Sequence, residues 1–233
     1  MSLALAHKRR VLEEQAKKPA PNPAGDKNFA RKASGMNAAE TRKLDEVKSQ
    51  LDGDLMTLSK LNGDEEKTPF KKDLIEKYRA LCEQLMQSHQ NWARLKVLFW
   101  WFMWRLDVEG FEAVQADWYH GIESGLTTPD SFSRDWQTIY LDALHNFAKD
   151  NVENPTDEQL NYLAIATAEL ESGLMVTNAP LKAKLYKVYG QTLEAKGYAD
   201  QAVNAYKNAL ELDDKVGVKK VIAQLEKELK TDE

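Results

Sequence analysis

The sequence predicts an all-α protein of helical hairpins, with one two-helix repeat near the C-terminus and an N-terminal coiled-coil helix. Apolar residues recur at steps of three or four along most of the 233 residues, which places them on one face of successive helices. Several prolines directly follow residues that cap helices well. No sustained two-residue alternation occurs outside the short stretch 174–177, so we expect no sheet.

The composition is typical of a soluble globular protein, with 42% hydrophobic and 30% charged residues. The longest apolar run, residues 97–104, is far shorter than the roughly 20 residues that span a bilayer. The N-terminus also lacks the pattern of a secretion signal. The single cysteine, Cys82, excludes an internal disulfide and a cysteine-based zinc site. We therefore expect a cytoplasmic protein that does not enter membranes.

The first element, residues 1–37, is predicted to be a flexible basic arm. Residues 1–43 hold ten Lys and Arg against four Asp and Glu, a net charge of +6, whereas the remaining residues hold 22 against 33, a net charge of −11. Alternate prolines in the stretch 19–25 favour an extended linker. Such an arm can neutralise phosphates, whereas the acidic remainder repels them at the level of net charge. The alternative is a tail that only solubilises the chain. The candidate DNA-binding residues are Lys8, Arg9, Arg10, Lys17, Lys18, Lys27, Arg31 and Lys32.

The second element, residues 38–63, is predicted to be an oligomerisation helix. Its apolar residues form a narrow stripe at steps of three or four, which suits a coiled-coil seam. The pair Asn62 and Gly63 ends the helix. The stripe, and therefore the candidate self-association surface, consists of Leu44, Val47, Leu51, Leu55, Leu58 and Leu61.

The remainder, residues 68–233, is predicted to be a helical body. Four helix starts are expected at Pro69, Pro129, Pro155 and Pro180, three of them after a Thr or Asn cap residue. The start near Pro155 is supported further by the capping-box pattern of residues 156–159.

The tryptophans mark the centre of this body. All six lie between Trp92 and Trp136, and four fall within one helix-sized segment, 92–104, that is apolar almost all round. A buried central helix explains this better than an exposed platform for stacking bases, because Lys and Arg are not interleaved.

Residues 183–214 match the spacing of one tetratricopeptide repeat, in which small residues let two helices cross closely. A single repeat cannot bury its own face, so it is expected to pack on the preceding helix and on the last one, giving a TPR-like part over 183–230. The predicted packing residues are Tyr186, Gly190, Gly197, Ala202, Tyr206 and Ala209.

Several short motifs, in order, resemble a known family. They are WRLD at 104–107, GLTTP at 125–129, the end of the repeat at 209–213, GVKK at 217–220 and LEKELK at 225–230. In this order, over residues 68–230, the chain resembles the small terminase subunits of temperate, contractile-tailed phages that package DNA from cohesive ends.

The resemblance implies a DNA-packaging factor in the host cytoplasm. Family members recognise the viral packaging site, form homo-oligomers, expected here to be rings, and deliver double-stranded DNA to a large subunit that supplies ATPase and nuclease activities. The C-terminal repeat is then expected to brace the body and to dock the large subunit. The exposed charges of the last helix, Lys219, Lys220, Lys227 and Lys230, are expected to matter little to folding. Docking is expected to depend on Lys219 and Lys220.

Members of this family are also described as the endonuclease subunit of terminase, so catalysis needs its own test. A metal-dependent nuclease needs carboxylates or histidines clustered around divalent ions. The nearest candidates are Asp107, Glu109, Glu112, Asp117 and His120, which are more typical of a solvated face. No phosphate-binding glycine loop or nucleophile elbow is present. We assign no catalytic residue, metal ligand or cofactor.

The alternative function is a cytoplasmic adaptor whose repeat binds a peptide or protein partner, as helical repeats commonly do. Salt-dependent binding to long double-stranded DNA separates the two hypotheses, because only the packaging factor is expected to show it.

Overall fold

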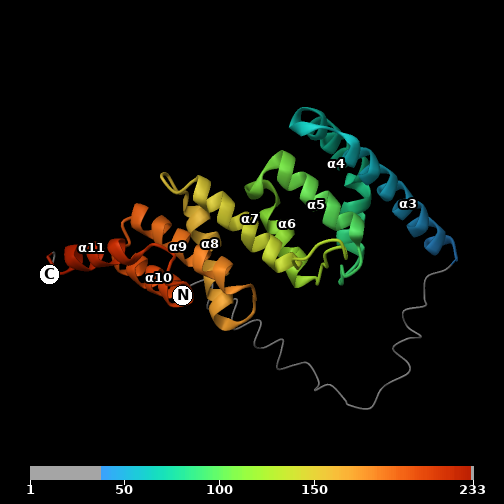
Figure 1. The fold of residues 1–233 in the computed structure, drawn as a ribbon. Helices are drawn as coiled ribbons and strands as arrows, with labels where there is room; N and C mark the ends of the chain where they lie inside the picture. Colours follow the sequence, from blue (N-terminus) through green and yellow to red (C-terminus); the bar gives the residue numbers. More distant parts are fainter. Residues whose placement is uncertain (1–37, 232–233) are drawn as a thin grey trace, which may run out of the picture. The chain divides into compact units, whose positions relative to one another are not determined.

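The computed structural model describes the backbone of residues 38–231 and the side chains of residues 46–231. Every regular element in this range is a helix, which confirms the all-α prediction (Figure 1). None of the helices in the described range is long and apolar enough to cross a membrane. The helices are α3 (Ala38–Lys60), α4 (Gly63–Ser88), α5 (Lys96–Glu109), α6 (Phe111–Glu123), α7 (Trp136–Asp150), α8 (Asp157–Ser172), α9 (Ala179–Ala195), α10 (Ala199–Leu212) and α11 (Lys219–Leu229).

The chain divides into two compact units, Met1–Phe70 and Lys71–Glu233. The described part of the first unit consists of α3 and the first turns of α4. The predicted helix over the apolar stripe therefore forms, and it ends at Lys60, close to the expected stop. Gly63 has a φ of +61°, which a glycine adopts without steric cost.

The start of α4 differs from the prediction. Pro69 lies inside the helix, which begins at Gly63. The first turn holds Asp64, Glu65 and Glu66, whose charges suit the positive end of the helix dipole. A carboxylate oxygen of Glu66 also accepts a hydrogen bond from the backbone N–H of Asn62 at 2.7 Å. These acidic residues favour a start one to two turns before the proline.

The other proline-marked starts fall into two groups. Pro129 begins a turn, and α7 starts seven residues later because Asp135 caps it through the backbone N–H of Thr138 at 2.7 Å. The predicted starts near Pro155 and Pro180 are confirmed. There Thr156 and Asn178 are the cap residues, each accepting a hydrogen bond from the backbone N–H three residues further on.

Most of the tryptophans lie in the core of the second unit, as predicted. The helix expected over 92–104 begins only at Lys96, however, so Trp92 precedes it, and Trp100 is half-buried. Five of the six are at most 3% exposed, and α5 lies among them with Trp101 and Trp104 each 1% exposed. The Trp101 indole N–H donates to the carbonyl oxygen of Ile75 at 3.0 Å. The Trp136 indole N–H donates to the carbonyl oxygen of Trp118 at 3.1 Å, which ties α7 to α6. These bonds satisfy polar groups that would be costly to bury unpaired.

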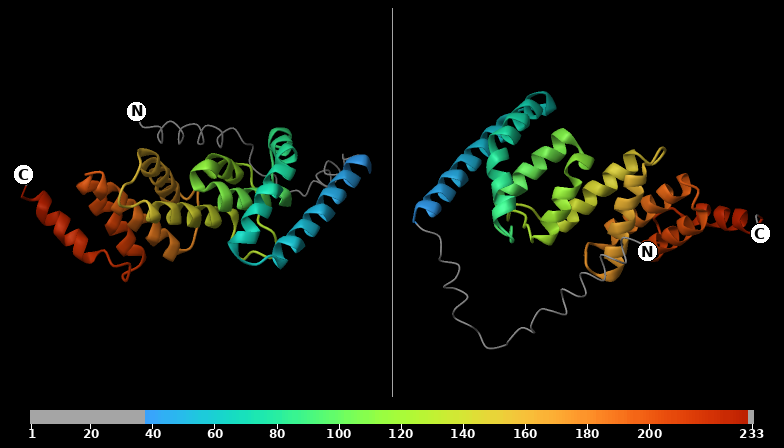
Figure 2. Two further views of the ribbon diagram at one scale, coloured as in Figure 1. Left: turned by 90° about the horizontal axis from the view of Figure 1, so that it is seen from above. Right: turned by 180° about the vertical axis from the view of Figure 1, so that it is seen from behind.

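Helices α5 to α11 pack in succession, each on its neighbour in the chain, and α9 also packs on α7 (Figures 1 and 2). Short connections between consecutive helices produce this order. The C-terminal helices are thus continuous with the aromatic core through α7 and α8.

Helices α9 and α10 form the predicted hairpin. A Cβ placed on Gly190 would lie only 2.7 Å from the Tyr206 ring, so a glycine is required for this close approach. Gly197 has a φ of +80° in the turn, and the next backbone N–H, that of Tyr198, returns to the carbonyl oxygen of Leu193 at 2.9 Å. Ala202 and Ala209 are fully buried. These contacts involve residues of the predicted packing set, whose assignment stays a prediction, as does membership of the tetratricopeptide class.

Candidate functional site

The eight predicted DNA-binding residues, Lys8 to Lys32, lie outside the described residues. The predicted oligomerisation stripe lies on α3, except for Leu61 just beyond its end. Leu51 is 3% exposed, and Val47, Leu55, Leu58 and Leu61 are half-buried, whereas the side chain of Leu44 lies outside the described part.

Three of the four carboxylates considered as metal ligands pair with basic side chains, and the fourth, Glu112, forms no ion pair within the described chain. Lys71 Nζ lies 2.6 Å from Asp107 Oδ2. Arg105 bridges the α5–α6 corner, with Nε 2.8 Å from Glu109 Oε2 and Nη1 2.6 Å from Asp117 Oδ2. The Arg105 guanidinium also lies 4.7 Å from the centre of the Trp101 ring. This arrangement stabilises the corner of two helices and leaves these carboxylates occupied.

The described residues contain no group of three or more His, Cys, Asp or Glu side chains placed to hold a metal ion. His120 lies 3.4 Å from Glu123 and edge-on to Trp92. Cys82 is fully buried, and burial raises the pKa of its thiol to about 12. A buried thiol of that pKa is a poor nucleophile at neutral pH.

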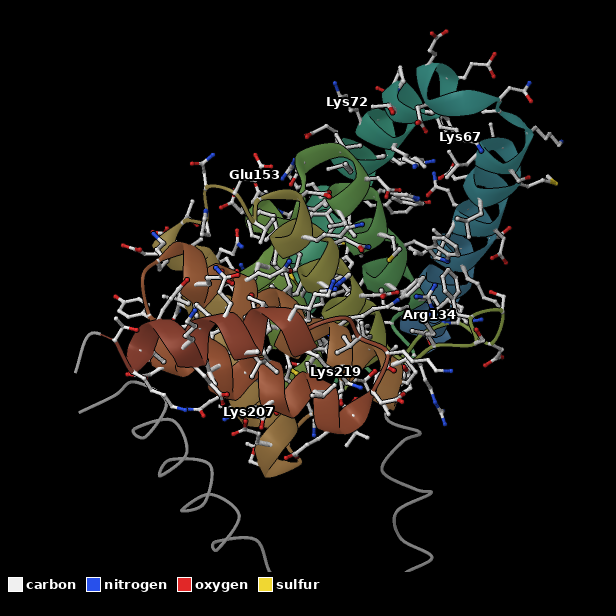
Figure 3. All side chains as sticks on the ribbon, turned by 60° about the vertical axis from the view of Figure 1, so that its left-hand side comes forward. Lys67, Lys72, Arg134, Glu153, Lys207 and Lys219 are labelled. Atoms are coloured by element: carbon white, nitrogen blue, oxygen red, sulfur yellow. The ribbon has the colours of Figure 1, made fainter. Side chains whose placement is uncertain are left out.

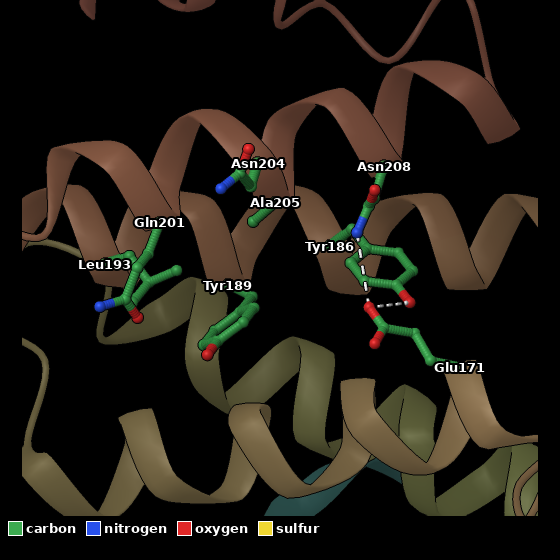
Figure 4. Close-up of a pocket in the computed structure, with 8 residues that line it drawn as sticks. All are labelled: Glu171, Tyr186, Tyr189, Leu193, Gln201, Asn204, Ala205 and Asn208. Atoms are coloured by element: carbon green, nitrogen blue, oxygen red, sulfur yellow. Dashed lines mark hydrogen bonds between the residues drawn. The ribbon is translucent and has the colours of Figure 1, made fainter.

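A groove of about 180 Å³ lies where α8, α9 and α10 meet (Figure 4). Tyrosines from α9 form one wall, carboxamides from α10 form the other, and a carboxylate from α8 closes one end. The lining residues are Glu171, Tyr186, Tyr189, Leu193, Gln201, Asn204, Ala205 and Asn208.

The carboxylate of Glu171 is exposed and is held by neutral donors. Tyr186 donates its hydroxyl to Glu171 Oε1 at 3.1 Å, and the Asn208 amide donates to the same oxygen at 3.4 Å (Figure 4). No Lys, Arg or His of the described chain forms an ion pair with Glu171. Burial, together with this negative charge, raises the pKa of Tyr186 and of Tyr189, so both keep their hydroxyl protons at neutral pH.

The carboxamides of the groove share one face of α10. Gln201, Asn204 and Asn208 are separated by three and four residues, the spacing of one helical face. Each carboxamide offers both donors and an acceptor, as a peptide backbone requires of its partner. Asn204 also lines a second hollow of about 600 Å³ between α10 and α11, which the 2.6 Å ion pair of Lys207 and Glu226 borders. The groove therefore presents hydrogen-bond donors and acceptors beside two tyrosine rings.

Sequence reasoning found the hairpin but not this groove. The spacing of the three carboxamides was readable in the sequence and would have indicated one polar face of α10. The sequence contains no indication that Glu171 belongs to the groove, because it contacts Tyr186 and Asn208 only once α8 packs on α9.

Comparison with known proteins identifies a family. The model of the phage small terminase subunit family matches residues 48–178, more than half of the chain. The match begins within α3 and ends at the residue that caps α9, so it includes the aromatic core and leaves out α9, α10 and α11. It agrees with the predicted family, although the resemblance was expected over residues 68–230. No curated protein and no solved structure matches the chain.

Proposed function

Because the chain belongs to the phage small terminase subunit family, we propose that it binds the packaging site of viral DNA, assembles with its own copies and delivers the DNA to the large terminase subunit. The family assigns the chain a role in DNA packaging. Binding, assembly and delivery are the steps by which it would perform that role.

The observation that carries the DNA-binding step is the division of charge. The N-terminal 43 residues have a net charge of +6, and the other 190 have a net charge of −11. Lys and Arg in the first segment can displace the counterions of a DNA duplex, which gives an affinity that falls steeply with salt. Sequence preference needs additional contacts with base edges.

The self-association step is assigned to the stripe on α3. Leu55 and Leu58 are only half-buried, so their exposed surface can gain from pairing with a second copy. Met56, 57% exposed, lies between them in sequence but outside the stripe and gives a matched control position.

The delivery step is assigned to the groove of α8, α9 and α10. Glu171 has no cationic partner within the described chain, so a Lys or Arg of a bound segment would complete it. The same groove favours the alternative function, a peptide-binding adaptor that has no DNA ligand.

DNA binding of the full chain tests the proposal. We expect wild type to bind a labelled duplex with strong salt dependence. Lys8→Gln with Arg9→Gln and Arg10→Gln is expected to lower the salt slope by about 0.9 for each phosphate that the variant no longer neutralises. Lys60→Gln with Lys72→Gln and Lys96→Gln, which removes three exposed lysines, serves as the control for an equal change in net charge.

Sedimentation of the same proteins tests assembly. Leu55→Ser with Leu58→Ser is expected to lower the assembly state, and Met56→Ser is expected to leave it unchanged. A wild-type chain that stays monomeric and does not bind DNA, but binds a basic peptide, would favour the adaptor.

A further inference from the structure

The second unit is acidic on average, but one part of its surface collects lysines. Lys187 of α9 donates a hydrogen bond from Nζ to the carbonyl oxygen of Val216 at 2.9 Å. A Cβ placed on Gly217 would lie 3.8 Å from the same nitrogen. Lys187 therefore reaches the α10–α11 loop, and its amine lies next to Val216 and Gly217, between Lys215 and the start of α11 in sequence.

The same surface continues onto α7. His145 of α7 is half-buried, and burial is the largest influence on its pKa, which is lowered. The charges of Lys184 and Lys149 lower this pKa further, against the hydrogen bond of Asn146 and the charge of Asp142. Lys184 of α9 and Lys149 of α7 thus lie on the same side of the molecule as His145, and Lys187 follows Lys184 by three residues on α9.

Together these residues form what we call the lysine cluster, composed of Lys149, Lys184, Lys187, Lys215, Lys219 and Lys220. Figure 3 labels Lys219 among the side chains of this part of the molecule. Five of the six are exposed, and Lys187 is half-buried.

None of the six forms an ion pair within the described chain. Other lysines of the same unit do so, since Lys71 pairs with Asp107, Lys196 with Asp157 and Lys207 with Glu226. Two acidic residues close to the cluster already have other partners. Asp142 pairs with Arg134, and Asp213 accepts a hydrogen bond from the backbone N–H of Lys215 at 2.9 Å. Asp150, Glu153, Glu211 and Asp214 are the remaining acidic residues within four positions of a cluster lysine. Lys184, Lys187, Lys219 and Lys220 have no acidic residue within four positions, so the surplus of positive charge is on α9 and α11.

The start of α11 adds positive potential at the same place. Its first turn holds Lys219 and Lys220, and the N-cap residue Val218 offers no side-chain acceptor to the free backbone N–H groups. Lysines in the first turn are repelled by the positive end of the helix dipole. A bound anion would interact favourably with the lysines and with the helix N-terminus.

We propose that the lysine cluster is a second DNA-contacting surface, which binds the phosphate backbone alongside the N-terminal arm. This inference rests on the proposed function and extends it to the helical body. Six lysines spread over α7, α9, the α10–α11 loop and α11 match the repeated charges of a duplex better than one isolated anion. The contact is independent of sequence, because lysines at phosphates carry no base readout.

The test compares two full-length double variants of equal charge change. Lys184→Gln with Lys219→Gln removes two members of the cluster but keeps Lys187, which holds the α10–α11 loop. Lys72→Gln with Lys96→Gln removes two exposed lysines of α4 and α5 that have no ion pair in the described chain. Binding to a labelled duplex of arbitrary sequence is measured across a potassium chloride series, and thermal melting checks that both variants fold like wild type.

We expect the cluster variant to lower the slope of log affinity against log salt by about 1.8, because two phosphates are no longer neutralised and each accounts for about 0.9. The control is expected to change the slope much less. Equal slopes for the two variants, with wild type binding DNA, would overturn the lysine cluster and leave the proposed function standing. Absence of DNA binding by wild type would overturn both.

A third measurement separates DNA from a protein partner. Lys219 and Lys220 were expected from the sequence to dock the large subunit, so capture of purified large subunit is measured with the same variants. Loss of capture by the cluster variant at unchanged DNA affinity would assign the cluster to the protein partner and overturn the inference. Loss of DNA affinity at unchanged capture supports it.

Discussion

The helices α5 to α7 and the helices α9 to α11 are held together by opposite kinds of packing. In the first group large rings fill the interior, with Trp118 and Trp136 4.6 Å apart between ring centres. In the second, small residues let helices approach, and Gly190 of α9 lies directly against the Tyr206 ring of α10. The aromatic group is most sensitive to removal of atoms, whereas the hairpin is most sensitive to their addition.

The family match separates the same two regions. It includes the aromatic helices and ends at the cap of α9. Most of the groove and most of the lysine cluster lie beyond it, on α9, α10, the α10–α11 loop and α11, whereas Glu171 of α8 and Lys149 of α7 lie within it. The match therefore covers the aromatic core and most of the α3 stripe, whereas the groove and the lysine cluster proposed above to bind partners lie mostly outside it.

Removal of a central tryptophan is expected to lower the free energy of unfolding more than any other change considered. Trp101→Ala removes a ring that is 1% exposed, leaves a cavity and deprives Arg105 of the ring beneath its guanidinium. We expect the free energy of unfolding to fall by about 3 to 5 kcal/mol, measured by urea denaturation. Trp100→Ala is the control, because Trp100 is half-buried and is expected to cost clearly less. Equal losses would contradict a core centred on the buried face of α5.

The second effect tests the hairpin in the opposite direction. Gly190→Ala adds one methyl group that would meet the Tyr206 ring at 2.7 Å. Tyr206 cannot move freely, because its hydroxyl donates to Glu194 Oε2 at 2.7 Å. We expect a loss of about 1 to 3 kcal/mol in the free energy of unfolding.

Gly53→Ala gives the matched control for this prediction. A Cβ on Gly53 has no neighbour within 4 Å, and the residue lies inside α3, so alanine is expected to stabilise the protein by about 0.5 to 1 kcal/mol. Opposite signs for the two variants, measured by thermal melting, support close packing at Gly190. A stabilising Gly190→Ala would show that the hairpin is loosely packed.

The parts of the fold that followed from the sequence are those fixed by local chemistry. A tryptophan cluster without interleaved Lys and Arg indicated a buried helix, and the Thr156 hydroxyl caps α8 as the pattern predicted. The capping box is incomplete, however, because the Gln159 side chain does not hydrogen-bond to the backbone N–H of Thr156. It donates instead to the Ala148 carbonyl oxygen at 3.2 Å and to Thr192 Oγ1 at 3.1 Å.

The parts that did not follow depend on competition between local signals or on contacts between distant residues. Acidic residues before Pro69 and the Asp135 cap decided where α4 and α7 begin, and the prolines did not. The candidate site was harder still. Glu171 meets Asn208 across 37 positions of sequence, and a net charge of −11 conceals a local surplus of lysines.

The smallest expected effect compares one tyrosine from each region at alkaline pH. Burial raises the pKa of Tyr140 on α7 to about 12, from 10.0 in the unfolded chain. Burial, assisted by the carboxylate of Glu194, also raises the pKa of Tyr206 on α10. A raised pKa means that the folded state holds its proton more tightly. The stability that each hydroxyl contributes is therefore complete below pH 10 and is lost as the pH rises through the folded pKa.

Between pH 10 and pH 11 we expect Tyr140 to account for a fall of about 1 kcal/mol in the free energy of unfolding, which Tyr140→Phe removes. The two regions are distinguished by Glu194→Gln. Glu194→Gln is expected to reduce the loss of stability at alkaline pH that Tyr206 causes, because the Glu194 carboxylate helps to raise the pKa of Tyr206. Tyr206→Phe is expected to abolish that loss. Glu194→Gln should leave the contribution of Tyr140 unaltered, because the pKa of Tyr140 is raised by burial and by the charges of Glu169 and Tyr162, lowered by the Gln115 hydrogen bond, and not influenced by Glu194. Urea denaturation at each pH measures both slopes. If Glu194→Gln changed the pH dependence contributed by Tyr140 as much as that contributed by Tyr206, the two tyrosines would titrate as a coupled pair. That result would contradict the interpretation of the two regions as electrostatically independent.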